Sequence, residues 1–435
     1  MITTQYGKLE GFHQDGVMRY LGIPFAKPPV GELLFRHPQE PEPWDGILEA
    51  VHGRANPMQS QSFFPSSYCS PDCLYLNVFK PDGITEPAPV MVWIYGGAFE
   101  NGGTGAREEG SPYVSYDLSE FAKDTGTICV TFNFRLNLYG FLNLSSYGPG
   151  FEVNNGIMDQ LAALTFIRNN IAAFGGDPEN ITLFGQSAGA ASVLTLLTMP
   201  AAKGLFHRAI LQSPVADHFF SEAESQKNAR TYLKYAGVKQ PEELSQLSQE
   251  AYEKANRRYV LSFLVHGDIR CAFSPVIDGQ IITGYPCSLL EGCTVPILIG
   301  HTTEEGNMFT PDLPSLLYVP AIAHMKLKGD KTEKDRKKRM SDAITRSQFI
   351  EPVDRIVSEY PGPVWKYIYT YVTPGNDRGC CHCSELSVLF QDPSLFGNPN
   401  TPEGRRVGHR MRQIWGEFAR HGTCAWEKRT AFIIA

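Results

Sequence analysis

The first third of the chain alternates short apolar runs with Pro- and Gly-containing turns. The run "VMVWIYGG" at 90–97 is continuously apolar and ends in glycines, which predicts a buried central strand. A second run, "GTICVTFNF" at 126–134, follows the helix-like "YDLSEFAKD" at 116–124. Because a strand, a helix and another strand follow one another, we expect the two strands to pair in parallel.

From Asn155 the spacing of apolar residues becomes helical, and this pattern stops at Gly175-Gly176. Strand and helix patterns then alternate toward the end of the chain. They are "NITLFG" at 180–185, "SAGAASVLTLLTM" at 187–199, "RAILQS" at 208–213, "TVPILIG" at 294–300, "VWKYIYTYV" at 364–372 and the helical "EGRRVGHRMRQIWGEFARHG" at 403–422. The run at 364–372 is the last strand that this pattern predicts.

Polar, helix-rich sequence interrupts the order of strands near 214–270 and 310–360. We therefore expect one α/β domain over residues 1–435, with a mostly parallel central sheet flanked by helices and with these two helical insertions covering one end of the sheet. The chain has 435 residues, of which 42% are hydrophobic and 20% are charged. This composition is typical of a compact globular protein and excludes wholesale disorder.

The formal net charge of −7 leaves no electrostatic footprint for nucleic acid or for an anionic membrane. A basic run at 326–340 alternates with acids and is typical of a solvated surface. No apolar stretch is long enough to span a bilayer, and the N-terminus lacks the pattern of a secretory signal. We therefore expect a cytoplasmic protein whose ten cysteines are mostly reduced thiols. The sequence does not indicate an oligomeric state.

The sharpest local signal is Gly185-Gln186-Ser187-Ala188-Gly189, a G-x-S-x-G between a predicted strand and a predicted helix. A serine on this tight turn needs tiny residues two positions before and after it, because the strand and helix backbones approach closely. Its hydroxyl then projects from the turn, while the N–H of Ala188 at the helix start favours an oxyanion. We expect Ser187 to be a nucleophile, and the alternative is a structural turn serine.

A glycine-rich loop with Gly96, Gly97 and Ala98 follows the first central strand. Main-chain N–H groups of such a loop can stabilise the negative charge of a tetrahedral intermediate, and alanine keeps its N–H. Together with Ala188, these three residues are the expected oxyanion hole. The alternative is a glycine turn that only needs positive φ.

The acid and the base are expected after later strands. In α/β folds with a G-x-S-x-G turn, the catalytic residues follow one another along the chain in the order serine, acid, histidine. Glu304 and Glu305 come just after the strand at 294–300, and either can be the acid. His382 lies in the loop after the last predicted strand. Neutral His382 would take the proton of Ser187, while a carboxylate fixes the imidazole tautomer.

Cysteines flank this histidine at Cys380, Cys381 and Cys383, which makes a zinc site an alternative for the segment. Structural zinc sites usually combine two ligand pairs, and no second C-x-x-C or H-x-x-H pair accompanies this one. Metal ligation would also occupy the imidazole nitrogens that acid–base chemistry needs. We therefore expect no metal and no cofactor, and we expect the thiols to make the protein sensitive to alkylation or oxidation.

These motifs resemble the type-B carboxylesterase family, which includes cholinesterases and bacterial para-nitrobenzyl esterases on the α/β-hydrolase fold. Matching stretches extend over most of the chain and include "YLGIPFAKPPVGELLF", "DCLYLNVF", "FNFRLNLYGFL", "EEGNMF" and "HCSELSVLF". The resemblance implies a serine carboxylesterase that forms an acyl-enzyme without metal or cofactor. It implies Ser187 as nucleophile, Glu305 rather than Glu304 as acid, and His382 as base.

The sequence departs from this family near the expected site. Gln186 stands where relatives usually have a glutamate, whose charge lies near the cationic head group in cholinesterases. The stretch 55–73 has Met58 in place of a disulfide cysteine and has no tryptophan to hold choline by cation–π attraction. Both departures argue against choline esters. Phe99, Phe309 and the segment 61–68 are candidate pocket walls.

The alternative to an esterase is a catalytically inactive binding module with the hydrolase fold. Such proteins generally lack the serine or the histidine, whereas all three catalytic positions are filled here. We therefore expect a small-molecule ester as the partner, and neither nucleic acid nor a membrane.

Overall fold

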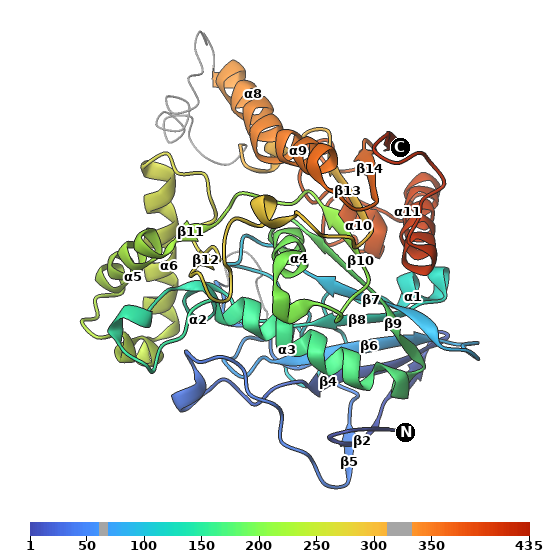
Figure 1. The fold of residues 1–435 in the computed structure, drawn as a ribbon, viewed down its shortest axis with the longest axis horizontal. Helices are drawn as coiled ribbons and strands as arrows, with labels where there is room; N and C mark the ends of the chain where they lie inside the picture. The colour runs from blue at the N-terminus through green and yellow to red at the C-terminus, as the bar shows by residue number, and fades with distance from the viewer. Residues whose placement is uncertain (61–67, 311–332) are drawn as a thin grey trace.

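In the computed structural model, which describes residues 1–60, 68–310 and 333–435, a ten-stranded sheet runs through the molecule (Figure 1). Its strand order is β15-β14-β13-β10-β9-β7-β8-β6-β4-β3. Neighbours from β15 to β8 are parallel, and β6, β4 and β3 continue the sheet in antiparallel pairs. The strands are β3 Phe12–Gln14, β4 Val17–Pro24, β6 Tyr75–Pro81, β7 Ala88–Ile94, β8 Ile128–Phe132, β9 Gly176–Gln186, β10 Arg208–Gln212, β13 Ile297–Thr302, β14 Val364–Tyr369 and β15 Ala431–Ile434.

Two small sheets accompany the large one. Their strands are β1 Ile2–Thr4, β2 Gly7–Glu10 and β5 Ile47–Glu49 in the first, and β11 Phe220–Ser221 and β12 Val276–Ile277 in the second.

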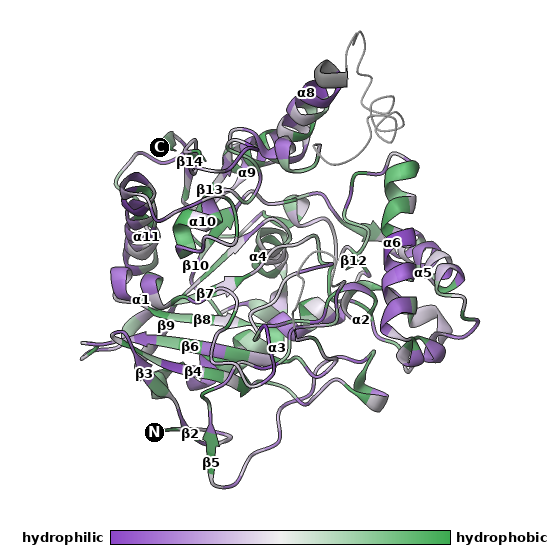
Figure 2. Cartoon of the chain, turned by 180° about the vertical axis from the view of Figure 1, so that it is seen from behind, coloured by the Kyte–Doolittle hydropathy of each residue, from purple (hydrophilic) through white to green (hydrophobic). Residues whose placement is uncertain are grey.

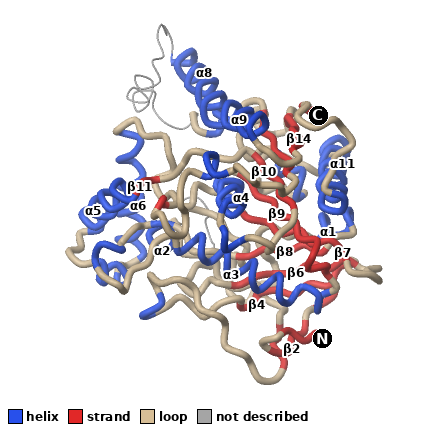
Figure 3. Tube along the Cα trace, viewed as in Figure 1, coloured by secondary structure: helices blue, strands red, loops and turns tan. Residues whose placement is uncertain are grey.

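Helices surround the strands (Figure 3). The α-helices are α1 Ser119–Thr125, α2 Asn137–Phe141, α3 Asn155–Asn170, α4 Ala188–Thr198, α5 Glu222–Ala236, α6 Gln249–Val265, α8 Glu333–Ile344, α9 Glu351–Glu359, α10 Glu385–Phe390 and α11 Pro402–His421. Shorter helical turns are η1 Gly31–Leu33, η2 Ser145–Tyr147, η3 Ile171–Phe174, η4 Pro200–Ala202, η5 Pro241–Gln246, η6 Pro286–Leu289, η7 Glu305–Met308 and the π-helical η9 Thr345–Ile350.

The mostly parallel α/β sheet expected from the sequence is confirmed. The two apolar runs first identified form β7 and β8, which pair in parallel with α1 between them in the chain. All seven residues of β7 are buried, as its continuous apolar pattern predicts. Trp93 of this strand packs between the rings of Phe184 and Phe390, at centroid distances of 4.8 and 4.9 Å.

The prediction that 364–372 holds the last strand is wrong. The chain forms β15 after α11, and this strand pairs in parallel with β14 at the edge of the sheet. β15 is four residues long, and only Ile434 is buried. So short a segment carries too few positions for a hydrophobic period to be recognised.

One continuous hydrophobic core contains buried residues from Leu9 to Ile434. Hydrophilic residues gather on α8 and α11 when the molecule is seen from behind (Figure 2). On α11, Met411, Trp415 and Phe418 are buried among exposed charged positions, so this helix packs on the sheet through one face.

Helices α5 and α6 occupy the stretch near 214–270 and pack side by side at the left of Figure 1. A capping box starts α5, in which the Ser221 hydroxyl and the Glu224 side chain bond each other's backbone N–H. In the stretch near 310–360, α8, η9 and α9 are formed, while 311–332 lies outside the described residues and includes the start of the basic run at 326–340. None of the helices in the described ranges is long and apolar enough to cross a membrane.

A buried ion pair ties the chain after β8 to α3. Arg135 Nε lies 2.8 Å from Asp159 Oδ2, and Arg135 Nη2 lies 2.6 Å from Oδ1 of the same carboxylate. Both side chains are almost completely buried. Two residues further on, Asn137 donates its backbone N–H to Phe99 and its side-chain N–H to Glu100, both to carbonyl oxygens. The ion pair therefore fixes the segment that supports the loop after β7.

We predict that Arg135→Met lowers the free energy of unfolding by about 3–5 kcal/mol, because Asp159 would remain buried without its partner. Equilibrium urea unfolding measures the loss. Arg168→Met is the matched control, because its partner Glu179 is mostly exposed; breaking that pair should cost no more than about 1 kcal/mol. Equal losses in the two variants would contradict the structural role of the buried pair.

Candidate active site

Ser187 lies on a sharp turn between the end of β9 and the start of α4. Its φ of 57° and ψ of −124° fall in a region that non-glycine residues rarely adopt. A Cβ on Gly189 would stand 2.0 Å from the carbonyl oxygen of Ile94, and a Cβ on Gly185 would stand 2.7 Å from the backbone of Gly189. The strand-turn-helix setting expected for a nucleophilic serine is therefore present, and neither glycine can be replaced without moving the backbone.

The loop after β7 lies directly against this turn. A Cβ on Gly96 would stand 2.9 Å from the Cβ of Ser187, so no side chain fits between the two loops. Gly97 has φ of 113° and Ala98 has φ of 59°, and Ala98 lines the same cavity as Ser187. Ala188 is the first residue of α4, where a backbone N–H has no partner within the helix. The structure thus brings all four expected oxyanion-hole residues to the serine.

His382 and Glu305 are in contact through His382 Nδ1 and Glu305 Oε2. The other carboxylate oxygen accepts hydrogen bonds from the Ser213 hydroxyl at 2.6 Å and the Thr302 N–H at 2.7 Å. Burial alone would raise the pKa of Glu305, but His382 and the two hydrogen bonds together hold that pKa below its usual value. An ionised carboxylate at this position keeps the proton of a neutral imidazole on Nδ1.

Glu304, the other candidate acid, does not take this place. Its side chain is exposed, and its carboxylate accepts a hydrogen bond from the Cys380 N–H at 2.9 Å. Adjacent residues point in different directions here, and only Glu305 reaches His382.

The side chain of Gln186 contacts the second nitrogen of the imidazole, Nε2 of His382. Gln186 Nε2 lies 3.2 Å from His382 Nε2. Because Nδ1 carries the proton, Nε2 has the lone pair, and the amide must be the donor. Gln186 Oε1 in turn accepts a hydrogen bond from the thiol of Cys383 at 3.2 Å. The imidazole is therefore held between a carboxylate and an amide.

The three thiols around His382 do not converge. Cys380 donates to the backbone carbonyl of Tyr369 at 3.1 Å, whereas Cys383 donates to a glutamine side chain. Within the described ranges, no group of three or more His, Cys, Asp or Glu side chains is arranged to hold a metal ion. Burial raises the pKa of Cys380 to about 11 and that of Cys381 to about 12, and it raises the pKa of Cys383 well above its usual value.

Glu385, at the start of α10, is a second buried carboxylate near the imidazole. It accepts a hydrogen bond from Gln212 Nε2 at 3.2 Å, and Trp415 donates to the oxygen of the same amide at 3.2 Å. Burial, and to a smaller extent the negative charge of Glu305, raises the pKa of Glu385 to about 7. Its carboxyl group is therefore partly protonated near neutral pH.

A cavity of about 300 Å³ lies over Ser187. Its apolar walls include Val260, Phe263, Leu264, Met340, Ile344 and Phe349. Its polar lining comes from Glu100, His218, Asp268, Arg270 and Gln348. This volume is at the lower end for ligand sites and suits a compact molecule with apolar groups.

Phe309 lines this cavity, as the sequence predicts, and its ring lies 5.4 Å from the His382 ring. The expectation for Phe99 is wrong, because only 1% of this residue is exposed and its ring packs on Phe141 at 4.6 Å. Phe99 therefore belongs to the core, although it follows the oxyanion loop directly. The candidate wall at 61–68 lies, except for its last residue, outside the described residues.

A model of the carboxylesterase family matches residues 1–317 and 315–431 of this chain. The chain belongs to the carboxylesterase family. As a member of this family it is a carboxylic ester hydrolase, and an ester is its substrate.

The para-nitrobenzyl esterase of Bacillus subtilis (strain 168) is 35% identical to this carboxylesterase, with 98% of this chain and 91% of that protein covered. The fumonisin B1 esterase of Sphingopyxis macrogoltabida is 32% identical, with 96% and 81% covered. Among solved structures, a PNB esterase has a TM-score of 0.85 at 32% identity and covers 100% of this chain and 95% of its own. A carboxylesterase of Geobacillus stearothermophilus at pH 6.8 has a TM-score of 0.83 at 34% identity, with the same coverage. The α/β-hydrolase fold expected from the sequence is confirmed.

The sequence alone did not indicate three residues of this site. Ser213 supports Glu305, Gln186 contacts the imidazole, and Glu100 lines the cavity beside Ala98. Gln186 was marked only by its departure from the family pattern. The position of Glu100 two residues after Ala98 was the one available sign that its carboxylate would face the cavity.

We predict that the native carboxylesterase resists iodoacetamide near neutral pH, contrary to the expectation from the sequence. Iodoacetamide reacts with the thiolate, and the raised pKa of Cys381 leaves about a thousandfold less thiolate than an unperturbed cysteine would have. Activity should persist while an exposed model thiol is consumed.

Mass spectrometry after the same treatment should show Cys381 and Cys383 unmodified. Urea at the same pH provides the control, since it should expose all ten cysteines to alkylation. Rapid loss of activity in step with labelling of either residue in the native protein would contradict the prediction.

Proposed function

We propose that Ser187, Glu305 and His382 form the catalytic triad of this carboxylesterase, which hydrolyses its ester through an acyl-enzyme. The contact between Glu305 and His382 carries the proposal, because it orients a buried imidazole that packs on Phe309 and Phe349, which line the same cavity as Ser187. The structural elements support it further. Ser187 follows β9, Glu305 follows β13 and His382 follows β14, at the same edge of parallel strands.

In the first step, the Ser187 hydroxyl attacks the carbonyl carbon of the ester. His382 Nε2 takes the hydroxyl proton as the new C–O bond forms, and Glu305 stabilises the imidazolium. The carbonyl oxygen becomes an oxyanion. The N–H groups of Gly97, Ala98 and Ala188 are the proposed donors to this oxyanion, with Gly96 keeping the two loops in contact.

The tetrahedral intermediate then collapses. The bond to the alcohol oxygen breaks, His382 returns its proton to that oxygen, and the alcohol leaves the acyl group on Ser187. Water next gives its proton to His382 and attacks the acyl carbon. A second tetrahedral intermediate releases the carboxylic acid and restores the Ser187 hydroxyl.

Gln186 affects this cycle because its amide and the Ser187 hydroxyl compete for the lone pair of His382 Nε2. In the structure the amide uses the lone pair that must receive the proton of Ser187. We infer that the amide gives way when the ester enters, because one lone pair cannot serve both donors at full strength. The hydrogen bond from Cys383 holds the amide oxygen on the other side and limits where the amide can move.

The second candidate function, an inactive binding module, is disfavoured because serine, acid, base and oxyanion loop are all present together. The apolar cavity supports esters with compact acyl and alcohol groups as substrates. Location in the cytoplasm stays a prediction of the sequence.

We predict that Ser187→Ala reduces kcat for para-nitrophenyl butyrate by at least about 10⁴-fold, with Glu305→Gln costing about 10³- to 10⁴-fold. Removal of the nucleophile abolishes the acyl-enzyme, and removal of the carboxylate charge leaves the imidazole in the wrong tautomer. The measurement is steady-state release of para-nitrophenol by the purified protein.

Glu304→Gln is the matched control, because it removes a neighbouring carboxylate that does not contact His382. Its kcat should stay within about twofold of the wild-type value. Full turnover by the Ser187→Ala protein, or equal losses in the two glutamate variants, would overturn the proposed triad.

A separate prediction concerns Gln186. In Gln186→Glu, a carboxylate beside His382 Nε2 would stabilise the protonated imidazole, which is inactive as a base. Activity should therefore be lost at higher pH on acidification than in the wild type, so the acid limb of the pH–rate profile moves upward by roughly one unit. The measurement is kcat/KM for para-nitrophenyl butyrate against pH. An unchanged acid limb would show that residue 186 does not act on the imidazole.

A further inference from the structure

Glu100 places a carboxylate in the cavity that holds the nucleophile. It follows the oxyanion loop by two residues and lines the cavity with Ser187 and Ala98. Its surroundings are largely apolar, with Val260 and Phe263 of α6 in the same lining. An acid in such an environment costs free energy unless it has a partner.

The backbone of Glu100 is firmly held. Its N–H donates to the carbonyl of Gly97 at 2.9 Å, and its own carbonyl accepts the side-chain N–H of Asn137 at 2.7 Å. Asn137 in turn follows the segment fixed by the buried pair of Arg135 and Asp159. The carboxylate is therefore attached to a backbone segment that is fixed beside the oxyanion loop.

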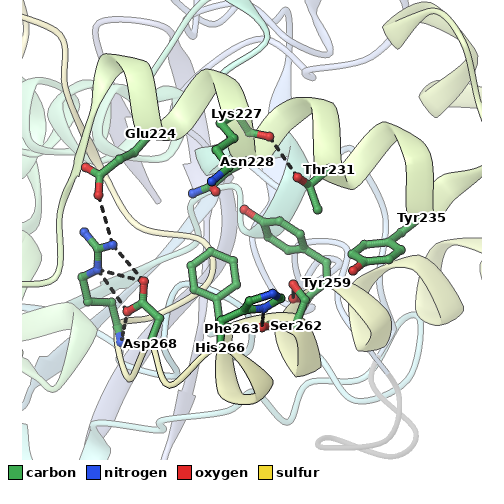
Figure 4. A pocket seen from close by; sticks show the side chains of 11 residues that line it. Glu224, Lys227, Asn228, Thr231, Tyr235, Tyr259, Ser262, Phe263, His266 and Asp268 are labelled. Carbon is green, nitrogen blue, oxygen red and sulfur yellow. Dashed lines mark hydrogen bonds and ion pairs between the residues drawn. The ribbon is translucent and has the colours of Figure 1, made fainter. Parts of the chain in front are cut away.

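No basic side chain of the described ranges forms an ion pair with Glu100. Burial raises the pKa of this carboxyl, the backbone N–H of Ala272 lowers it in part, and no nearby cation lowers it. Asp268, the other carboxylate of the cavity, is bound to Arg270 at 2.8 Å, and Glu224 holds the same guanidinium at 3.2 Å. The dashed lines in Figure 4 mark the contacts of Glu224 and Asp268 with this group. Arg270 is thus already neutralised, and Glu100 is the cavity acid left without a counter-charge.

The other titratable groups around Glu100 are neutral near pH 7. Burial raises the pKa values of Cys271, Tyr252 and Tyr259, whose thiol and phenols face Glu100 electrostatically. Burial lowers the pKa of His218, which also lines the cavity. Burial raises the pKa of Glu100 itself to about 8. A positive group that enters the cavity would favour the ionised carboxylate and release its proton.

Resting on the proposed esterase function, we propose that Glu100 is a specificity-determining residue that binds a cationic group of the substrate. The preferred substrates are then compact carboxylic esters that carry an alkylammonium group, on either the acyl or the alcohol part. Residue 186, beside the imidazole, has an uncharged amide. Glu100 supplies a negative charge from a different wall of the site.

The test compares charged esters with neutral esters of the same shape. For the alcohol part, butyrylcholine is paired with 3,3-dimethylbutyl butyrate. For the acyl part, para-nitrophenyl 4-(trimethylammonio)butanoate is paired with para-nitrophenyl 5,5-dimethylhexanoate. The quantity is the ratio of kcat/KM for the charged ester to kcat/KM for its neutral partner, which cancels the pH dependence of the triad because both esters share the chemical step.

In the wild type, this ratio should exceed one for at least one pair and should rise about fivefold or more between about pH 6.5 and about pH 8.5, as Glu100 ionises. Glu100→Gln should lower the ratio at the higher pH by about tenfold and make it independent of pH. Hydrolysis of the neutral esters by this variant should change much less. Which pair responds tells whether the charge belongs to the acyl or the alcohol part.

Glu250→Gln is the matched control, since it makes the same charge change at an exposed position on α6. Its ratios should equal those of the wild type. The proposal is overturned if Glu100→Gln leaves the ratios unchanged or lowers kcat/KM equally for both esters of each pair. It is also overturned if Glu100→Gln changes the ratios no more than Glu250→Gln does. If the wild type hydrolyses neither these four esters nor para-nitrophenyl butyrate, the esterase function itself is refuted.

Discussion

The site depends on the close approach of the Ser187 turn to the end of β7. Ile94 at the end of that strand leaves no room for a side chain on Gly189, and the serine takes a backbone conformation that costs free energy of roughly 1–3 kcal/mol. This strain is maintained by the parallel pairing of β9 with both β7 and β10. The same contact places the loop of Gly96 against the serine. The proposed nucleophile and its proposed oxyanion donors are therefore brought together by packing of backbone on backbone.

Environment gives three glutamates around this site different charges. Glu305 is completely buried, yet two hydrogen bonds and the imidazole favour its ionised form. Glu385 is also buried and lies near that negative charge, so its pKa rises toward neutrality. Glu100 lies in a mostly apolar cavity, where only the backbone N–H of Ala272 offsets burial, and its proton is held more tightly still. The number of donors that face each carboxylate decides which one can orient a base and which one is left to respond to a ligand.

Much of the fold could be predicted from the sequence, because buried parallel strands have long apolar runs and the nucleophile turn needs glycines at fixed positions. The short strand β15 was not predicted, because four residues are too few to show a hydrophobic period. The choice between Glu304 and Glu305 could not be made from their spacing alone, because both follow β13 and only side-chain direction separates them. Phe99 and Glu100 show the same limit, as one packs into the core and its neighbour lines the cavity. The contact of Gln186 with the imidazole joins positions 196 residues apart in the chain, so no local pattern can reveal it.

Ser187 is the proposed nucleophile, and covalent labelling tests this assignment most directly. A fluorophosphonate that forms a stable adduct with activated serines should modify the protein once, in proportion to the loss of esterase activity. Peptide mapping by mass spectrometry should place the adduct on Ser187. Continued turnover with Ser187 fully labelled, or inactivation with the adduct on another residue, would contradict the claim.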